Sequence, residues 1–290
     1  MPPALITPAT LVLLAGVLGL LVGSFLNVVI LRLPDRLIHG WKQQSRELLE
    51  IGDDEGDMPV APPGIVREPS HCPKCKHALG ALENIPLLSW LVLRGRCRHC
   101  GAAISLQYPL VELLTALCSA AIAWKFGFAW QTAAGLVLTW TLIALAGIDV
   151  RTQLLPDQMT LPLLWLGLVL SVFPLFVPSH ASIVGAAAGY LSLWSVYWLF
   201  KLATGKEGMG YGDFKLLAAL GAWMGPGALL PIVLLSSLIG ALVGGTYLAI
   251  RSQDRATPIP FGPFIAAAGW AWFAAGEQLS HFGLLRFFAP

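Results

Sequence analysis

Charged side chains are scarce in this chain of 290 residues: Asp, Glu, Lys and Arg make up 12% of it, and hydrophobic residues make up 56%. The mean hydropathy of +0.71 lies outside the range of ordinary soluble domains. The formal net charge is only +2, and no basic tract interleaved with aromatic residues is present, so a nucleic-acid partner is not expected. The composition predicts an all-α polytopic membrane protein surrounded by lipid.

The N-terminus also lacks the basic start of a cleavable signal peptide, and its first apolar run is long enough to span a bilayer. We therefore expect a retained first transmembrane helix within residues 1–33. About seven more helices are expected in a membrane core at residues 106–290. The apolar runs begin near Thr10, Leu106, Ala129, Gln158, Ser182 and Leu229, with a shorter run at 214–225 and a last one after Pro263.

Lys and Arg residues fix the expected orientation, because they collect in short cytoplasmic loops. Residues 1–9 contain neither residue type, so they are placed outside and the loop 34–105 inside. This loop is the only large region expected outside the membrane. Its first half predicts a short amphipathic helix followed by an acidic, Pro-rich connector at 51–70 that matches no motif we recognise.

Four of the five cysteines form two CxxC pairs in the second half of the loop, "CPKC" at 72–75 and "CRHC" at 97–100. Two such pairs resemble the knuckles of a zinc ribbon, and thiols on the cytosolic side stay reduced. Cys72, Cys75, Cys97 and Cys100 are therefore predicted to hold a structural zinc ion, with four thiolates leaving no open position for water. The alternative is a redox-active CxxC pair.

Acidic residues at membrane depth are functional candidates. Asp149 closes an apolar run at its C-terminal end, where the helix dipole disfavours a negative charge. Asp213 opens a later run behind Gly208, Gly210 and Gly212. The predicted topology places both aspartates at the cytoplasmic face, where two carboxyl groups that approach each other could activate water for peptide hydrolysis.

Two other acidic residues have simpler structural readings. Asp157 follows Pro156 at the start of an apolar run and is suited to cap a helix. Glu112 begins the second apolar run, where it is either an acid of the first helical turn or a residue of the active site.

Several motifs together resemble the type IV prepilin peptidase family. They are "GSFLNVVILRLP" (23–34), the paired cysteines, "ENIPLLSWLVLRGRC" (83–97), "YPLVE" (108–112), "DVRTQLLPD" (149–157), "GMGYGDFKLLAALGAWMG" (208–225) and "PIPFGPF" (258–264). The GxGD pattern at 210–213 is weak by itself, since presenilin-like proteases share it.

This resemblance implies a bifunctional, multi-pass enzyme of the bacterial inner membrane. Asp149 and Asp213 would be the catalytic aspartates, with Gly210, Gly212, Glu112 and Asp157 as motif residues that support the site. The partners implied are type IV prepilins and type II secretion pseudopilins, cleaved after a short basic leader and then N-methylated from S-adenosylmethionine. No glycine-rich nucleotide fingerprint is present, so the residues that bind the methyl donor are not assigned.

Two other classes of function fit part of the sequence. A transporter or channel would use intramembrane carboxylates to bind cations, but these would be expected near the midplane, within broken helices. A noncatalytic assembly component would use the zinc module to hold a partner, and would leave Asp149 without an explanation.

Overall fold

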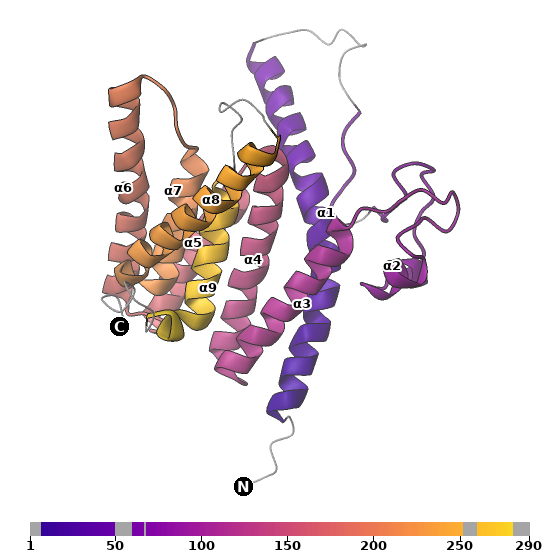
Figure 1. The fold of residues 1–290 in the computed structure, drawn as a ribbon, viewed down its shortest axis with the longest axis horizontal. Coiled ribbons are helices and arrows are strands. Elements are labelled where there is room, and N and C mark those ends of the chain that lie inside the picture. The colour runs from indigo at the N-terminus through magenta and orange to yellow at the C-terminus, as the bar shows by residue number, and fades with distance from the viewer. Residues whose placement is uncertain (1–6, 50–59, 67, 252–259, 281–290) are drawn as a thin grey trace. The chain divides into compact units, whose positions relative to one another are not determined.

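The computed structural model describes residues 7–49, 60–66, 68–251 and 260–280, and it divides into two compact units, residues 1–124 and 125–290. Within the described residues the structure is helical, with two isolated β-bridges and no strand (Figure 1). The helices are α1 (Pro8–Leu48), α2 (Leu88–Val92), α3 (Gln107–Phe126), α4 (Trp130–Thr152), α5 (Asp157–Val172), α6 (Ser179–Thr204), α7 (Tyr211–Met224), α8 (Leu229–Arg251) and α9 (Gly262–Ser280), with 3-10 turns at Ala81–Asn84 and Pro226–Ala228.

Helices form at all eight of the apolar runs found in the sequence. Five of them are long and apolar enough to cross a membrane: α1, α3, α4, α6 and the stretch Pro226–Thr246, which includes most of α8. Helix α5 is apolar but shorter, and α7 has only 14 residues, fewer than the ~20 that a hydrocarbon core requires. The described helices therefore support a polytopic membrane protein with five candidate spans.

Helix α1 is longer than the sequence analysis expected. The apolar run ends near residue 33, but the helix continues through Pro34 to Leu48, so the helix predicted after residue 34 is present as a continuation of α1. Hydropathy locates the end of the apolar run, whereas residues 35–48 are mostly polar and include several good helix formers, among them Arg, Gln, Glu and Leu. Arg32 on this helix donates hydrogen bonds to the carbonyls of Gly64 (2.6 Å) and Glu68 (3.0 Å), which hold the connector against α1.

In the unit of residues 1–124, α1 and α3 approach each other closely at small residues. A Cβ atom added to Gly19 or Gly23 would lie 2.7 Å from the Cα atom of Ala116 or Glu112, respectively. Asn27 adds a polar contact, since its side-chain amide donates to the carbonyl of Tyr108 at 3.1 Å. Glycines at this spacing allow the close backbone approach by which membrane helices associate.

In the unit of residues 125–290, α7 is the central helix and contacts α5, α6 and α9. From Asp213 to Trp223 every side chain except that of Lys215 is buried. Helices α6 and α7 meet backbone to backbone at Gly185 and Gly221, where a Cβ atom on either residue would collide with the other helix. A helix that is apolar all round and enclosed on every side belongs to the protein core rather than to the lipid boundary.

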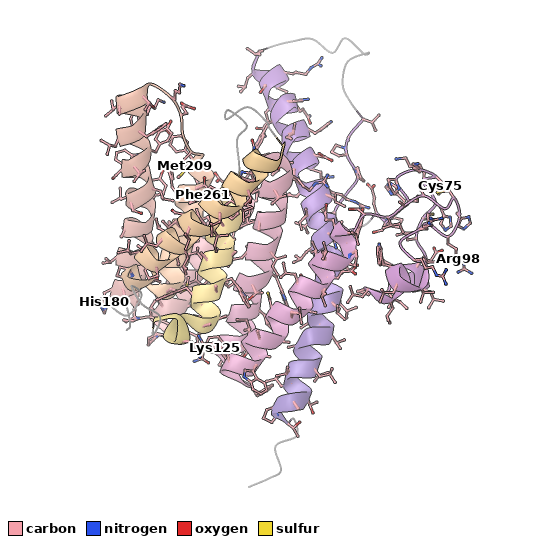
Figure 2. The ribbon with its side chains drawn as sticks, viewed as in Figure 1. Cys75, Arg98, Lys125, His180, Met209 and Phe261 are labelled. Carbon is pink, nitrogen blue, oxygen red and sulfur yellow. The ribbon has the colours of Figure 1, made fainter. Side chains whose placement is uncertain are left out.

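Within this second unit, the connections that carry the predicted site lie at one end. Met209, just before α7, and Phe261, just before α9, lie at the same end, whereas Lys125 and His180 lie at the opposite end (Figure 2). The last turn of α4 and the first turns of α7 and α9 therefore meet at one end of the helix bundle.

Candidate functional site

Asp149 lies in the last turn of α4 and is 5% exposed. Its main-chain carbonyl accepts the amide of Gln153, which ends the helix with a left-handed φ of 55°. The negative end of the helix dipole disfavours a carboxylate here, as the sequence indicated. The compensating contact comes from a distant residue, because the main-chain amide of Gly262 donates a hydrogen bond to the Asp149 carboxylate.

Asp213 lies in the first turn of α7 and is 8% exposed. Gly210 is the N-cap residue, so Asp213 is the third residue of the helix and does not itself cap it. The main-chain amide of Gly210 interacts with its carboxylate, and the first turn of a helix favours an acidic residue. This position does not require the side chain to be buried.

Asp149 and Asp213 are close enough that the charge on Asp149 acts on Asp213. Leu155, in the connection after α4, packs beside them. A Cβ atom added to Gly212 would lie 2.7 Å from the Cβ atom of Leu155, and one added to Gly262 would lie 2.6 Å from Oδ2 of Asp149. Two buried carboxylates thus share one site, whose wall is built from side chains and glycine backbone.

Asp157 begins α5 but makes no capping hydrogen bond, because Pro156 is the N-cap residue. Its two carboxylate oxygens instead lie 2.6 and 2.8 Å from Nζ of Lys215 on α7. The structure therefore replaces the capping role considered for Asp157 with an ion pair that joins α5 to α7.

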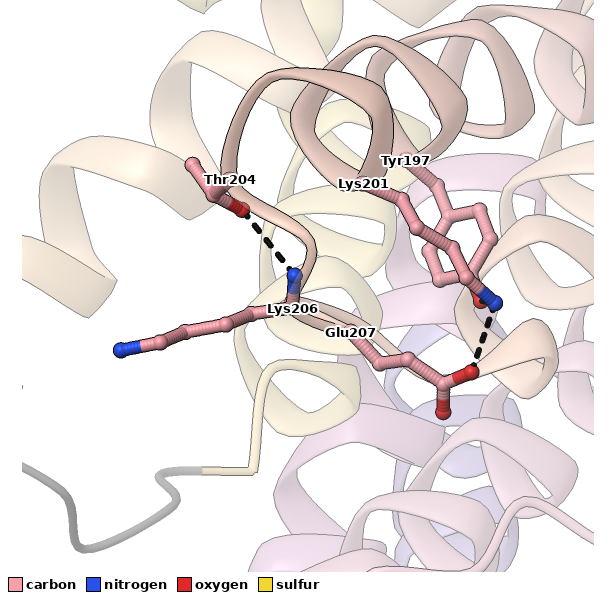
Figure 3. A network of polar contacts seen from close by, with 5 residues as sticks. All are labelled: Tyr197, Lys201, Thr204, Lys206 and Glu207. Atoms are coloured by element: carbon pink, nitrogen blue, oxygen red, sulfur yellow. Dashed lines mark hydrogen bonds and ion pairs between the residues drawn. The ribbon is translucent and has the colours of Figure 1, made fainter.

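The connection that leads to Asp213 is fixed by a polar network at the end of α6. Nζ of Lys201 lies 2.8 Å from Oε1 of Glu207 and 3.2 Å from the hydroxyl oxygen of Tyr197 (Figure 3). The hydrogen bond and positive charge of Lys201 lower the pKa of the Glu207 carboxyl group. The amide of Lys206 also donates to the hydroxyl of Thr204 at 3.3 Å. These contacts hold residues 205–207 just before the GxGD motif.

The four paired cysteines form a single cluster, as their spacing predicted. All four Sγ atoms lie within 4.8 Å of one another. Each pair sits in a similar turn: the amide of Cys72 donates to the carbonyl of His77, and the amide of Cys97 donates to the carbonyl of Ala102. Bridges at His71–Ala78 and Arg96–Ala103 close the two turns in the same way.

The donor set of this cluster fits a zinc ion. Main-chain hydrogen bonds at Cys75 and Lys74 lower the pKa of the Cys72 thiol to about 6, which favours the thiolate that binds metal. At Cys75 the hydrogen bond at His77 also lowers the pKa, but burial and the neighbouring sulfur atoms outweigh it and raise the pKa to about 11. Four thiols this close cannot all ionise unless a cation balances their charge, and Zn²⁺ bound by four sulfurs is such an arrangement.

The cysteine module is braced by nearby polar residues. The rings of His77 and His99 stack with their centroids 3.7 Å apart. Nε2 of His77 lies 3.5 Å from the Glu83 carboxylate, which also accepts the amide of Gly80 at 3.0 Å. The hydrogen bond at Gly80, followed by that at His77, lowers the pKa of Glu83.

Glu112 is 7% exposed and connects α3 to the loop before it. Its Oε2 atom accepts the main-chain amide of Leu87 at 2.8 Å, and its carboxyl group also bonds the side chain of Ser24 on α1. Leu87 has a φ of 59°, which a leucine adopts only under constraint. In this structure Glu112 is therefore a bracing residue of the first unit.

Leu155 and Gly262 were not assigned to the site from the sequence, although both belong to motifs quoted above. Gly262 is 113 positions from Asp149 in the sequence, so no local spacing relates the two residues. A glycine followed by proline at the start of a helix was the only signal available.

Comparisons with known proteins identify the family of the chain. Residues 17–126 match the Bacterial Peptidase A24 N-terminal domain, and residues 136–245 match the Type IV leader peptidase family. The chain is 57% identical to a "Prepilin leader peptidase/N-methyltransferase" of Xanthomonas campestris over 94% of both chains. Proteins of the same name from Pseudomonas aeruginosa and Dichelobacter nodosus are 54% and 49% identical, over 94% and 91% of this chain and 93% and 91% of their own.

No solved structure matches the chain. The two matched domains together cover most of the sequence, and the relatives align over nearly their whole length. The chain therefore belongs to the type IV leader peptidase family.

Proposed function

We propose that this protein cleaves the leader peptide of type IV prepilins and pseudopilins and then N-methylates the new N-terminal residue. The observation that carries the proposal is the pair of buried aspartates, Asp149 and Asp213, at one end of the second unit in a chain whose relatives are named for these activities.

The aspartate dyad (Asp149 and Asp213) supplies the groups that peptide hydrolysis requires. Like charges in a buried site favour a state in which one carboxyl group holds a proton and the other is ionised. The ionised group takes a proton from water as the water oxygen attacks the scissile carbonyl carbon. The protonated group donates to the carbonyl oxygen, and the intermediate collapses as the C–N bond breaks and the leaving amine takes up a proton.

Their position in the helices supports a hydrolase more than a transporter. Asp149 is in the last turn of α4 and Asp213 is in the first turn of α7. A cation pathway is expected to place its carboxylates near the bilayer midplane, within discontinuous helices. Carboxylates at helix ends suit a substrate that is cut at the membrane surface.

For the membrane arrangement, we propose eight membrane helices in the bacterial inner membrane, of which α7 is short and enclosed by its neighbours, with the loop 34–105 and the dyad on the cytoplasmic side. The distribution of Lys and Arg among the loops supports this orientation. The proposed organisation is a first transmembrane helix (1–33), the loop domain (34–105) and a peptidase core (106–290).

The second activity transfers a methyl group from the sulfonium of S-adenosylmethionine to the new N-terminal amine, which loses a proton. The relatives' names support it. We propose that Cys72, Cys75, Cys97 and Cys100 hold a structural zinc ion in the loop domain. With four thiolate ligands, this ion orders the loop and takes no part in hydrolysis.

The test is to incubate the purified protein in detergent with a prepilin and S-adenosylmethionine and to measure the intact mass of the substrate. We expect loss of the leader and gain of one methyl group, with neither change in an Asp213→Asn variant that folds normally. Cleavage without methylation would remove the transferase from the proposal. Equal cleavage by Asp213→Asn would refute the dyad.

A further inference from the structure

Gly262 is the first residue of α9, and its main-chain amide is not needed by that helix. The amides of Phe264 and Ile265 bond to the carbonyl of Phe261, at 3.0 and 3.2 Å, and Pro263 has no amide hydrogen. The amide of Gly262 instead donates to the carboxylate of Asp149. A free donor of a first helical turn thus points at one member of the dyad.

The space beside Gly262 is filled by the groups of the site. A Cβ atom at this position would lie 2.6 Å from Oδ2 and 3.2 Å from Cγ of Asp149, and 3.1 Å from Cδ1 of Leu155. The first distance is shorter than real Cβ contacts allow, so the Asp149 carboxylate would have to move. Position 262 therefore has to lack a side chain if Asp149 is to keep its place.

Helix α9 is held in place by contacts with α4 and α7, so it can fix the position of the Asp149 carboxylate. Nε1 of Trp270 on α9 donates to the hydroxyl of Thr139 on α4 at 3.0 Å. On another side, Gly269 packs directly against Leu220 of α7. Because α9 is attached both to the helix that carries Asp149 and to the helix that carries Asp213, the amide of Gly262 has a fixed position relative to both.

We propose that Gly262 is a positioning residue of the peptidase site: its amide orients the Asp149 carboxylate, and its missing side chain leaves room for that carboxylate. This role rests on the proposed function. Gly262 does not touch the reacting water and affects it only through Asp149. Gly262 therefore differs from Gly212, whose missing side chain makes room for Leu155.

The experiment measures kcat and KM for prepilin cleavage by the full-length protein carrying Gly262→Ala. Displacing a reacting group by about 1 Å can lower a rate by about 100-fold, so we expect a fall of that order in kcat, with KM changed by no more than about a factor of two. The zinc content and the methylation of a pilin supplied without its leader should stay at wild-type levels. Gly245→Ala on α8 is the matched control, because nothing lies within 4 Å of its added Cβ atom.

A second variant separates the positioning of Asp149 from simple crowding. Gly262→Ala combined with Leu155→Ala relieves the contact with Leu155 and leaves the collision with Asp149. We expect its thermal stability to recover while kcat stays low. Recovery of kcat in this double variant, or a near-normal kcat in Gly262→Ala, would overturn the positioning role.

Asp149→Asn, assayed in parallel, separates this role from the proposed function. If Asp149→Asn abolishes cleavage and Gly262→Ala does not, only the positioning role of Gly262 fails. If Asp149→Asn cleaves normally, both proposals fail.

Discussion

Replacing Glu112 with alanine should loosen the loop that precedes α3. The Leu87 amide loses its acceptor at 2.8 Å, and Ser24 loses its bond to the same carboxyl group. Because Leu87 is only half-buried, water can partly replace the lost bond, so we take the lower end of the usual cost, about 1 kcal/mol.

The backbone of Leu87 is strained in the closed loop, because its φ of 59° and ψ of −49° are sparsely populated for a residue with a side chain. This strain is released on opening whether or not Glu112 is present, so it does not add to the effect of the substitution. The expected change is the lost bond alone, about 1 kcal/mol, which corresponds to a roughly 5-fold rise in the equilibrium for local opening.

Hydrogen exchange followed by mass spectrometry of peptides that contain Leu87 measures this change directly. We expect exchange at this amide to accelerate by that factor in Glu112→Ala, while amides in α7 keep their protection. A Leu87→Gly substitution in the same background should restore part of the protection, because glycine adopts a positive φ without strain. Unchanged exchange at Leu87 in Glu112→Ala would show that the carboxyl group does not brace the loop.

Two further changes test the helix packing and the metal site. Gly185→Ala should destabilise the second unit by at least about 1–3 kcal/mol, because the new Cβ atom collides with the backbone of Gly221. The measurement is the melting temperature in detergent. A value equal to that of Gly245→Ala would contradict the prediction. Cys72→Ser should reduce bound zinc below one ion per chain. Zinc affinity of the unaltered protein should fall as the pH drops, because the Cys75 thiol must lose a proton to bind the ion, and it should fall more steeply below about 6, where the Cys72 thiol is protonated too. Elemental analysis across a pH series checks both statements, and stoichiometric zinc in Cys72→Ser would exclude the four-thiolate site.

Local sequence patterns were sufficient to place the helices and the cysteine cluster. An apolar run of sufficient length has to satisfy its own backbone hydrogen bonds, and in a membrane protein it does so as a helix. Two CxxC pairs each impose a tight turn that directs both thiols to one side, which is why Cys72, Cys75, Cys97 and Cys100 could be grouped from their spacing. The unusual positions of Asp149 and Asp213 at the ends of apolar runs were also visible in the sequence.

The sequence was less informative where a helix leaves the membrane or where helices share a surface. Helix α1 continues to Leu48 because helix formation does not depend on hydropathy alone. Asp157 was read as a cap, which is the usual role of aspartate at a helix start, but the packing of α5 on α7 brings Lys215 to it. The choice between a cap and an ion pair depends on a neighbour 58 residues away.

The sequence by itself thus determined which segments are helical, which thiols gather and which carboxyl groups are out of place in an apolar chain. Only the tertiary structure decided that Asp149 and Asp213 share a site, that α7 is enclosed by α5, α6 and α9, and that Gly262 lies against Asp149. The physical reason is the range of the interactions. Backbone hydrogen bonding and side-chain periodicity act over a few residues, whereas the contacts around Asp149 come from helices that meet only when the whole bundle packs.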